Sequence, residues 1–413
     1  MTTTGALDIA ALNVTGFETL NLRANPGPSS TAGGPTTAAG DRTTFITGTI
    51  TGPTLNTINL TGTAVNIANV ATTVPVTING SALTGDGLAA ATQAGLTVAG
   101  SAVAGSTITG SGVRDVFTIA AEGSAYNGGA GNDSMTTTVA ILLADGTNDG
   151  TMNGGEGTDT LVVSDTTTTL TDTHFIKLSN FEGLTLTNTA GDASITTGGG
   201  FNSAFANGVT IATGTLAATK DITFAGGLAT VPITLTVDAT NITGAATDVQ
   251  AIVTGSAADN VTFTATAATY VGVTGAAAQG TIAISTNAGA DTITFNYGQL
   301  LANAQAGAQA VTITGGTGAD TITKLTGSLN STTVTSTTVF VMAAGDSGTT
   351  IATQDKITGF SLGGVAAGTL SDVLDFEGTA VVSAFTASVD FGSILSHSVT
   401  GGIVTFDTAA TFA

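Results

Sequence analysis

Apolar and polar residues alternate along most of this chain, in short runs separated by glycine, asparagine or proline. Runs of this kind lie at 44–52, 56–70, 74–80, 95–100, 208–214 and 231–244. A period of two residues is the pattern of a β-strand with one buried and one polar face. The near-regular recurrence of such runs, with turns between them, is typical of stacked β-sheets. We therefore predict an all-β fold, an elongated parallel β-helix or β-solenoid, with a few short helices expected at 88–94, 202–208, 216–220 and 299–310.

The strongest local motif is Gly-Gly-x-Gly-x-Asp, which occurs twice between Tyr126 and Val163 and ends at Asp133 and Asp159. Glycine allows the backbone to turn with positive φ and lets carbonyl oxygens approach where a Cβ would block them. The aspartate adds a hard anionic oxygen, and Ca²⁺ prefers several such oxygens in a flexible geometry. We predict that calcium is bound by these aspartates together with the main-chain carbonyls of Gly128, Gly129, Gly154 and Gly155.

Related turns recur along the chain. A third full copy of the motif ends at Asp320 and contains Gly315 and Gly316, while Asp291 keeps one of the glycines. Asp115 and Asp259 stand in similar turns that have lost them. The six aspartates are separated by 18, 26, 100, 32 and 29 residues, unlike the short steps of tandem nonapeptides. We predict calcium ligation at all six, in a solenoid whose long rungs each use one such turn.

Further acidic residues lie beside glycines without a fixed pattern and are added as candidate calcium ligands: Asp145, Asp149, Asp346 and Asp355. The first two lie between the strongest motifs, which predicts a cluster of several ions there. We divide the chain into an N-terminal β-rich region (1–110), a calcium-binding cluster (111–165), a middle solenoid region (166–255) and a C-terminal region with the later turns (256–413).

The charge balance narrows the possible partners. The chain has 28 acidic and 7 basic residues, and its formal net charge is −21. Nucleic-acid binding needs lysine and arginine to neutralise phosphates, so the sequence predicts no nucleic-acid partner. The acids serve either solubility or divalent cations, and their clustering in glycine-rich turns favours cations.

The sequence offers little for catalysis. There is no cysteine, and the two histidines, His174 and His397, stand in alternating apolar contexts that predict positions on strand faces. No Gly-x-Ser-x-Gly motif precedes a helix, and Trp is absent, so a sugar-binding aromatic platform is not expected. The number of acids by itself leaves a paired-carboxylate glycosidase open. We predict a protein that is not an enzyme, with neither a secretory signal peptide nor a transmembrane segment.

The glycine-aspartate turns resemble those of the RTX family of type I secreted proteins. The segment 339–376 is similar to the region that caps the β-roll in protease members of that family. The background rich in Thr, Ala and Gly, and the phrase GFETLNL at 16–22, resemble the RTX surface-layer (S-layer) proteins of stalked bacteria.

The resemblance implies a structural protein that assembles with copies of itself into a calcium-dependent two-dimensional lattice on the bacterial cell surface. It also implies secretion directed by an uncleaved C-terminal signal, here near 391–413. Relatives of this kind are anchored to lipopolysaccharide by a helical N-terminal region that this sequence does not show. The chain is therefore expected to be a lattice-forming fragment or a member anchored differently.

Two alternatives remain. The first is a secreted RTX adhesin or passenger that binds a partner without forming a lattice. The second is a β-helical carbohydrate-active enzyme with RTX modules, such as a polyuronate epimerase, which the scarcity of Lys, Arg, His and Tyr disfavours.

Overall fold

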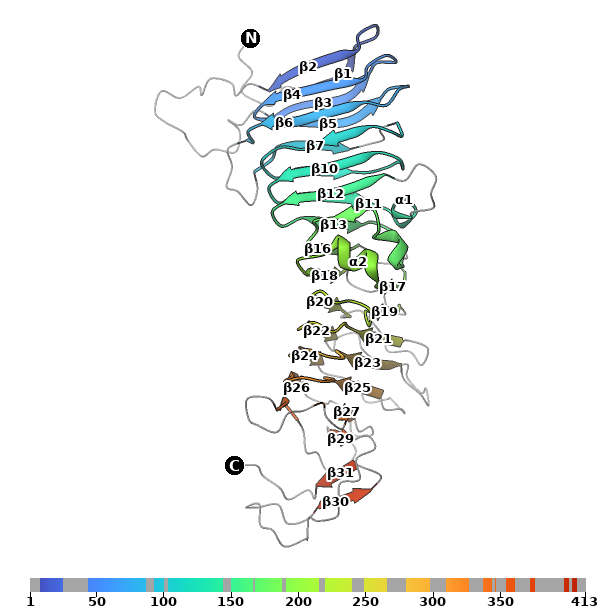
Figure 1. Ribbon diagram of the computed structural model, residues 1–413, viewed down its shortest axis with the longest axis vertical. Coiled ribbons are helices and arrows are strands. Elements are labelled where there is room, and N and C mark those ends of the chain that lie inside the picture. The colour runs from blue at the N-terminus through green and yellow to red at the C-terminus, as the bar shows by residue number, and fades with distance from the viewer. Residues whose placement is uncertain are drawn as a thin grey trace, which may run out of the picture. The chain divides into compact units, whose positions relative to one another are not determined.

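A computed structural model confirms the predicted fold class, because the chain is built almost entirely from short parallel strands (Figure 1). It describes residues 8–24, 44–86, 93–99, 103–143, 150–165, 168–187, 191–214, 220–239, 249–265, 280–297, 310–326, 337–343, 346, 354–360, 372–375, 397–400 and 403–406. Two compact units are present. Unit 1 consists of 1–165, 171–185 and 199–209, and unit 2 of 166–170, 186–198 and 210–413.

Unit 1 is a solenoid of two parallel sheets, and the chain alternates between them. Sheet A1 contains β1 (Asp8–Asn13), β3 (Thr44–Thr51), β5 (Ala64–Ala71), β7 (Leu96–Ala99), β9 (Val116–Thr118), β11 (Ser134–Thr137), β13 (Thr160–Val163) and β16 (Gly183–Leu186). Sheet B contains β2 (Thr19–Ala24), β4 (Thr57–Gly62), β6 (Thr77–Leu83), β8 (Thr107–Thr109), β10 (Ala125–Ala130), β12 (Thr151–Glu156) and β15 (Leu178–Ser179). One strand from each sheet makes a rung.

The core of unit 1 is built from columns of inward side chains that repeat from rung to rung. In sheet B the register aligns one such column, which consists of Leu20, Ile58, Ile78, Ile108, Tyr126, Met152 and Leu178. All of these except Leu20 are buried. The alternation seen in the sequence therefore places every second residue in the core, since successive side chains of a strand point to opposite faces.

Short helices interrupt unit 1 where the rungs grow longer. They are α1 (Val139–Leu142), the 3-10 helix η1 (Asp172–His174) and α2 (Gly199–Ala204). Three buried rings pack together there, with Phe175 at 5.2 Å from Phe201 and 5.8 Å from Phe205. The Asp172 carboxylate accepts the N–H groups of Gly200 and Phe201 at the start of α2. Helix α2 overlaps the predicted helix at 202–208.

Unit 2 is a second two-sheet parallel solenoid. Sheet A2 contains β18 (Val209–Thr213), β20 (Ile233–Asp238), β22 (Asn260–Ala265), β24 (Thr292–Tyr297), β26 (Thr321–Thr326) and β28 (Lys356–Thr358). Sheet C contains β14 (Thr168–Leu170), β17 (Ala193–Thr196), β19 (Ile222–Ala225), β21 (Val249–Val253), β23 (Thr281–Ser285), β25 (Ala310–Thr314), β27 (Thr337–Val341), β29 (Val373–Asp375), β31 (Ile403–Phe406) and β30 (His397–Thr400). The last two strands join sheet C antiparallel.

Several sequence predictions fall outside the described residues. These include most of the expected helices at 88–94, 216–220 and 299–310, and most of the expected secretion signal at 391–413. The prediction that His174 lies on a strand face is wrong. This residue ends η1, where its Nδ1 accepts the N–H of Thr171 at 3.0 Å. No helix in the described parts of the chain is long and apolar enough to span a membrane.

Candidate metal centre formed by two aspartate ladders

Most of the predicted calcium aspartates lie in the turns that lead into sheet A1 in unit 1 or into sheet A2 in unit 2. In unit 1, Asp115 lies between β8 and β9, Asp133 between β10 and β11, and Asp159 between β12 and β13. Neighbouring rungs pair in register there, for example Ser134 with Thr160. Residues far apart in the sequence are therefore stacked directly on one another, as the long-rung prediction expected.

A continuous hydrogen-bonded ladder joins these residues. The N–H of Asp115 donates to Oδ1 of Asp133 at 2.7 Å, and the N–H of Asp133 donates to Oδ1 of Asp159, also at 2.7 Å. The N–H of Asp159 then donates to Oε2 of Glu182 at 2.9 Å. This first ladder thus comprises Asp115, Asp133, Asp159 and Glu182, and each carboxylate receives the backbone of the preceding rung.

Glu182 was missed by the sequence analysis. Its motif signal is weak, because no Gly-Gly-x-Gly precedes it and the acidic side chain is one carbon longer. A usable clue is position: in the phrase NFEGLTL, Glu182 directly precedes a strand of sheet A1, as each aspartate does. In the related phrase GFETLNL at 16–22, Glu18 precedes β2 of sheet B instead, and Phe17 is 65% exposed whereas Phe181 is buried.

Unit 2 contains a second ladder with the same bonding. The N–H of Asp259 donates to Oδ1 of Asp291 at 2.7 Å, that of Asp291 to Oδ1 of Asp320 at 2.9 Å, and that of Asp320 to Oδ1 of Asp355 at 3.0 Å. The second ladder is Asp259, Asp291, Asp320 and Asp355. The N–H of Ile233 donates to Oδ1 of Asp259 at 2.8 Å. Asp259 therefore makes the same contact as the other ladder aspartates, although its turn has lost the glycines.

The other carboxylate oxygen of the inner members is left without a partner. Oδ2 is buried and accepts no hydrogen bond in Asp133, Asp159, Asp291 and Asp320. Asp115 differs, because its Oδ2 accepts the N–H of Ser111 at 2.6 Å. A buried anionic oxygen without a donor is costly, so each of these four oxygens calls for a proton or a cation.

The first glycine of each motif makes room for that unpartnered oxygen. A Cβ built on Gly128 would lie 2.1 Å from Oδ2 of Asp133 and 2.1 Å from the carbonyl oxygen of Gly154. The two oxygens are therefore at most twice that distance apart. On Gly315 a Cβ would lie 2.5 Å from Oδ2 of Asp320. At Gly128 a carboxylate and a carbonyl oxygen from neighbouring rungs thus lie close together, and calcium binding at this position stays a prediction.

The second glycine of each motif serves backbone packing. Gly129, Gly155 and Gly316 have positive φ angles of 106°, 114° and 84°. A Cβ on Gly155 would lie 2.1 Å from the carbonyl oxygen of Gly129, and one on Gly316 would lie 1.7 Å from that of Asn287. Only glycine permits both this conformation and this approach of two rungs.

Burial changes the acidity of the ladder carboxyls. It raises the pKa of Asp133 from 3.8 to about 8, and the neighbouring charges of Asp115 and Asp159 add to the rise. Burial likewise raises the pKa of Asp291 to about 7 and those of Asp320 and Asp115 to about 6. Hydrogen bonds from backbone N–H groups oppose these shifts without cancelling them. The folded chain therefore holds these carboxyls in surroundings that favour neutralisation.

The ligand atoms that the ladders offer are of the chemical type that calcium prefers. Carboxylate and carbonyl oxygens are the ligands it prefers, and the unpartnered Oδ2 atoms provide one anionic oxygen per inner rung. In the described ranges no three Asp, Glu, His or Cys side chains gather in a group that could hold a metal. A calcium ion at either ladder would therefore combine an Oδ2 atom with main-chain carbonyls such as that of Gly154.

The remaining candidate ligands have different outcomes. Asp346 lies close enough to the end of the second ladder for its charge to raise the pKa of Asp320 and of Asp355. Its Oδ2 accepts the N–H of Ala343 at 2.6 Å in a local turn. Asp145 and Asp149 lie outside the described residues, so the predicted multi-ion cluster stays a prediction.

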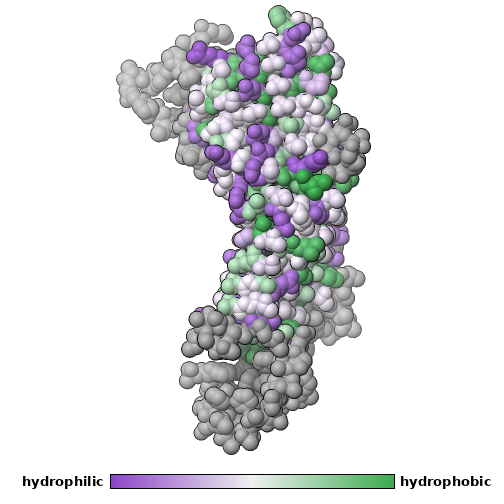
Figure 2. Space-filling view, in the orientation of Figure 1, coloured by the Kyte–Doolittle hydropathy of each residue, from purple (hydrophilic) through white to green (hydrophobic). Residues whose placement is uncertain are grey.

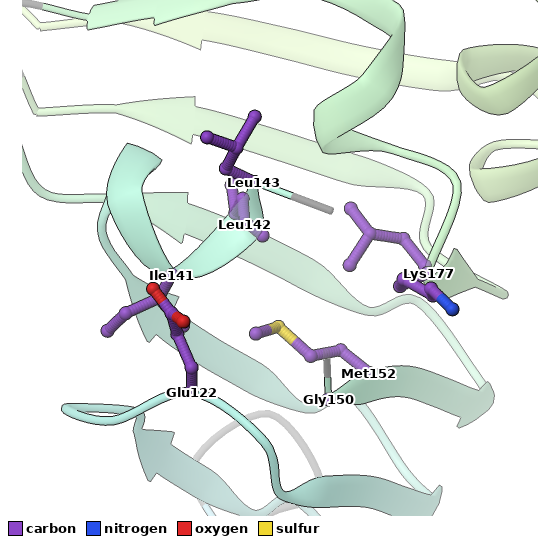
Figure 3. A pocket seen from close by; sticks show the side chains of 8 residues that line it. Glu122, Ile141, Leu142, Leu143, Gly150, Met152 and Lys177 are labelled. Atoms are coloured by element: carbon purple, nitrogen blue, oxygen red, sulfur yellow. The ribbon is translucent and has the colours of Figure 1, made fainter. Parts of the chain in front are cut away.

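A pocket in unit 1 is lined by residues that do not belong to the ladders (Figure 3). Its lining includes the apolar residues Ile141, Leu142 and Met152, and its charged residues are Glu122 and Lys177. It contains neither a histidine nor a pair of carboxylates, so we assign it no catalytic role.

Comparison of the chain with protein-family models, with curated proteins and with solved structures finds no match.

Proposed function

We propose that this chain is a calcium-stabilised structural protein that assembles with copies of itself into a layer on the bacterial cell surface. The observation that carries the proposal is the pair of aspartate ladders with buried, unpartnered Oδ2 atoms. A cation bound between rungs would neutralise these oxygens in the folded chain and add stability in proportion to its occupancy. In this proposal the ladders serve rigidity, and the chain is not an enzyme.

A large uncharged face in unit 2 supports self-assembly. The outward positions on β17 to β27 of sheet C carry only small or apolar side chains: Ser194, Thr196, Thr223, Ala225, Val249, Ala251, Val253, Thr281, Ala283, Ser285, Thr312, Thr314, Val339 and Val341. Val249 is 43% exposed and Val253 is 36% exposed. We call these residues the sheet C outer face.

The absence of charged side chains from this face matters because the chain as a whole is strongly negative. Two copies of a chain with net charge −21 repel each other over most of their surfaces. They can approach at least electrostatic cost where charges are missing, as on the sheet C outer face. Pale, weakly polar residues also cover much of the described surface in Figure 2. A second copy is therefore a fitting partner for this face.

Calcium-dependent assembly of the purified chain tests the proposal. We expect added Ca²⁺ to raise the melting temperature and to produce periodic sheets in electron micrographs, and EGTA to reverse both effects. Unchanged circular dichroism, melting and assembly after EGTA would contradict it. A chain that is stabilised by Ca²⁺ but stays monomeric would favour the alternative, a secreted adhesin that binds a partner without forming a lattice.

A further inference from the structure

One lysine is buried inside unit 2 at a position that its neighbours fill with apolar residues. The register of β20, β22, β24 and β26 aligns Val237, Phe263, Phe295 and Lys324 in one inward column. The first three are fully buried, and the side chain of Lys324 is only 2% exposed. The aromatic column therefore ends in an amine that is shielded from water.

The amine lies against the carboxyl group of Asp372. Nζ of Lys324 is 2.6 Å from Oδ1 of Asp372, whose side chain is 0% exposed. Asp372 directly precedes β29, which pairs with β27 so that Asp372 lies opposite Thr338. The N–H of Thr338 also donates to Oδ1 of Asp372, at 3.3 Å.

The inward columns of sheet A2 and of sheet C both change from apolar to polar residues at the same rung. In sheet C the column of Ile282 and Val311 continues with Thr338, just where Lys324 follows Phe295 in sheet A2. A buried ion pair must overcome the desolvation of two charges, and apolar residues of similar volume are often at least as stable. Packing alone therefore does not explain why an amine, a carboxyl group and an N–H donor lie together in this core.

We propose that Lys324 and Asp372 form an intramolecular isopeptide bond. The ammonium of Lys324 first gives one proton to the carboxylate, which leaves a neutral amine beside a carboxylic acid. The Nζ lone pair attacks Cγ, a C–N bond forms, and one C–O bond breaks. The departing oxygen takes the acid proton and one proton from Nζ and leaves as water. The products are a secondary amide and one water molecule, and no oxidant or co-reactant is needed.

The fold supplies what this condensation lacks in solution. Holding the two groups in contact raises their effective concentration to about 10⁵–10⁸ M in favourable cases. The N–H of Thr338 stabilises charge on the oxygen that remains in the amide. Exclusion of water from both side chains opposes hydrolysis of the product. Condensation also replaces two buried charges with one neutral amide.

The bond would covalently join β26 to the residue that precedes β29, across the core of unit 2. The linked residues are 48 positions apart. Since the chain has no cysteine, this link would be its means of closing a long loop covalently. The inference does not depend on calcium binding or on assembly into a layer.

Mass spectrometry of the full-length chain tests this inference. We expect an intact mass lower by one water molecule than the sequence mass, and a proteolytic fragment in which the Lys324 and Asp372 peptides remain joined. An intact mass equal to the sequence mass, with both peptides found separately, would overturn the proposal.

Variants sharpen the test. Lys324→Met and Asp372→Ala should each show the full sequence mass. Asp372→Asn should lose one molecule of ammonia instead of water, because the attacked amide releases NH₃. Circular dichroism checks that each variant folds. Refolding the unlinked wild-type chain, isolated early after synthesis, should produce the mass loss over time, and an early sample that folds but never loses water would also overturn it.

Discussion

The N–H of Asp133 donates to Oδ1 of Asp159 at 2.7 Å, although 26 residues separate the two in the sequence. This contact makes the geometry of one rung depend on the side chain of the next. It also leaves Oδ2 of each residue buried without a partner. Stability of the solenoid and neutralisation of its carboxyls are therefore coupled at the same residues.

Asp133→Asn and Asp133→Ala should separate the two roles of the carboxylate. The asparagine keeps an oxygen for the N–H of Asp115 and places Nδ2 beside the carbonyl of Gly154. Without Ca²⁺ we expect it to melt higher than wild type, because the wild-type carboxyl must bind a proton or bury its charge on folding, whereas the neutral amide does neither. The alanine leaves the N–H of Asp115 without an acceptor and should lose about 1–3 kcal/mol of unfolding free energy.

Thermal melts with Ca²⁺ and with EGTA provide the measurement. Calcium should raise the melting temperature of wild type and have a smaller effect on Asp133→Asn, which lacks the anionic oxygen. Equal responses of both proteins to Ca²⁺ would show that Asp133 is not a ligand.

Gly128→Ala should destabilise unit 1 strongly, because its Cβ would lie 2.1 Å from Oδ2 of Asp133 and from the carbonyl of Gly154. Gly112→Ala is the matched control, since a Cβ there meets nothing within 4 Å. We expect a large fall in melting temperature for the first variant and almost none for the second. Similar melting of both would disprove the close packing at the first ladder.

Stability in the absence of calcium should fall as the pH rises from about 4 to about 8. The pKa of Asp133 is raised to about 8 and that of Asp291 to about 7 in the folded chain, whereas both lie near 3.9 when unfolded. Between these pH values the folded state holds more protons than the unfolded state. The contribution of these carboxyls to the free energy of unfolding is therefore fully present below about pH 4, and it is lost as the pH rises through the folded-state pKa of each group. Saturating Ca²⁺ should flatten the dependence of melting temperature on pH. Without Ca²⁺, a melting temperature that rises over this pH range would contradict the burial of these groups.

A charge placed on the sheet C outer face should prevent assembly. Val253→Asp adds a carboxylate to an exposed, uncharged position of β21. Thr236→Asp is the control, because it adds the same charge to an exposed position of β20 in sheet A2. We expect size-exclusion chromatography and electron microscopy in Ca²⁺ to show loss of assembly for Val253→Asp and retained assembly for Thr236→Asp. Normal assembly of Val253→Asp would place the interface elsewhere.

Local patterns in the sequence were sufficient for the fold class and for most of the ladder residues. Alternation marks strands because the side-chain period of a strand is two, and glycine-aspartate turns mark corners because few residues tolerate those φ angles. Asp115 and Asp259 could be found in the same way, since each precedes a strand even where the glycines are lost. His174 was misplaced because an apolar alternation also surrounds a short 3-10 helix.

The sequence by itself determined that this chain forms stacked strands with acidic turns, because those features depend on neighbouring residues. Only the tertiary structure decided which turns meet. It brought Glu182 under Asp159, paired Lys324 with Asp372, and left Oδ2 of Asp133 buried beside the carbonyl of Gly154. These contacts join residues from different rungs, and their partners are set by the register between strands, which depends on the packing of the whole solenoid.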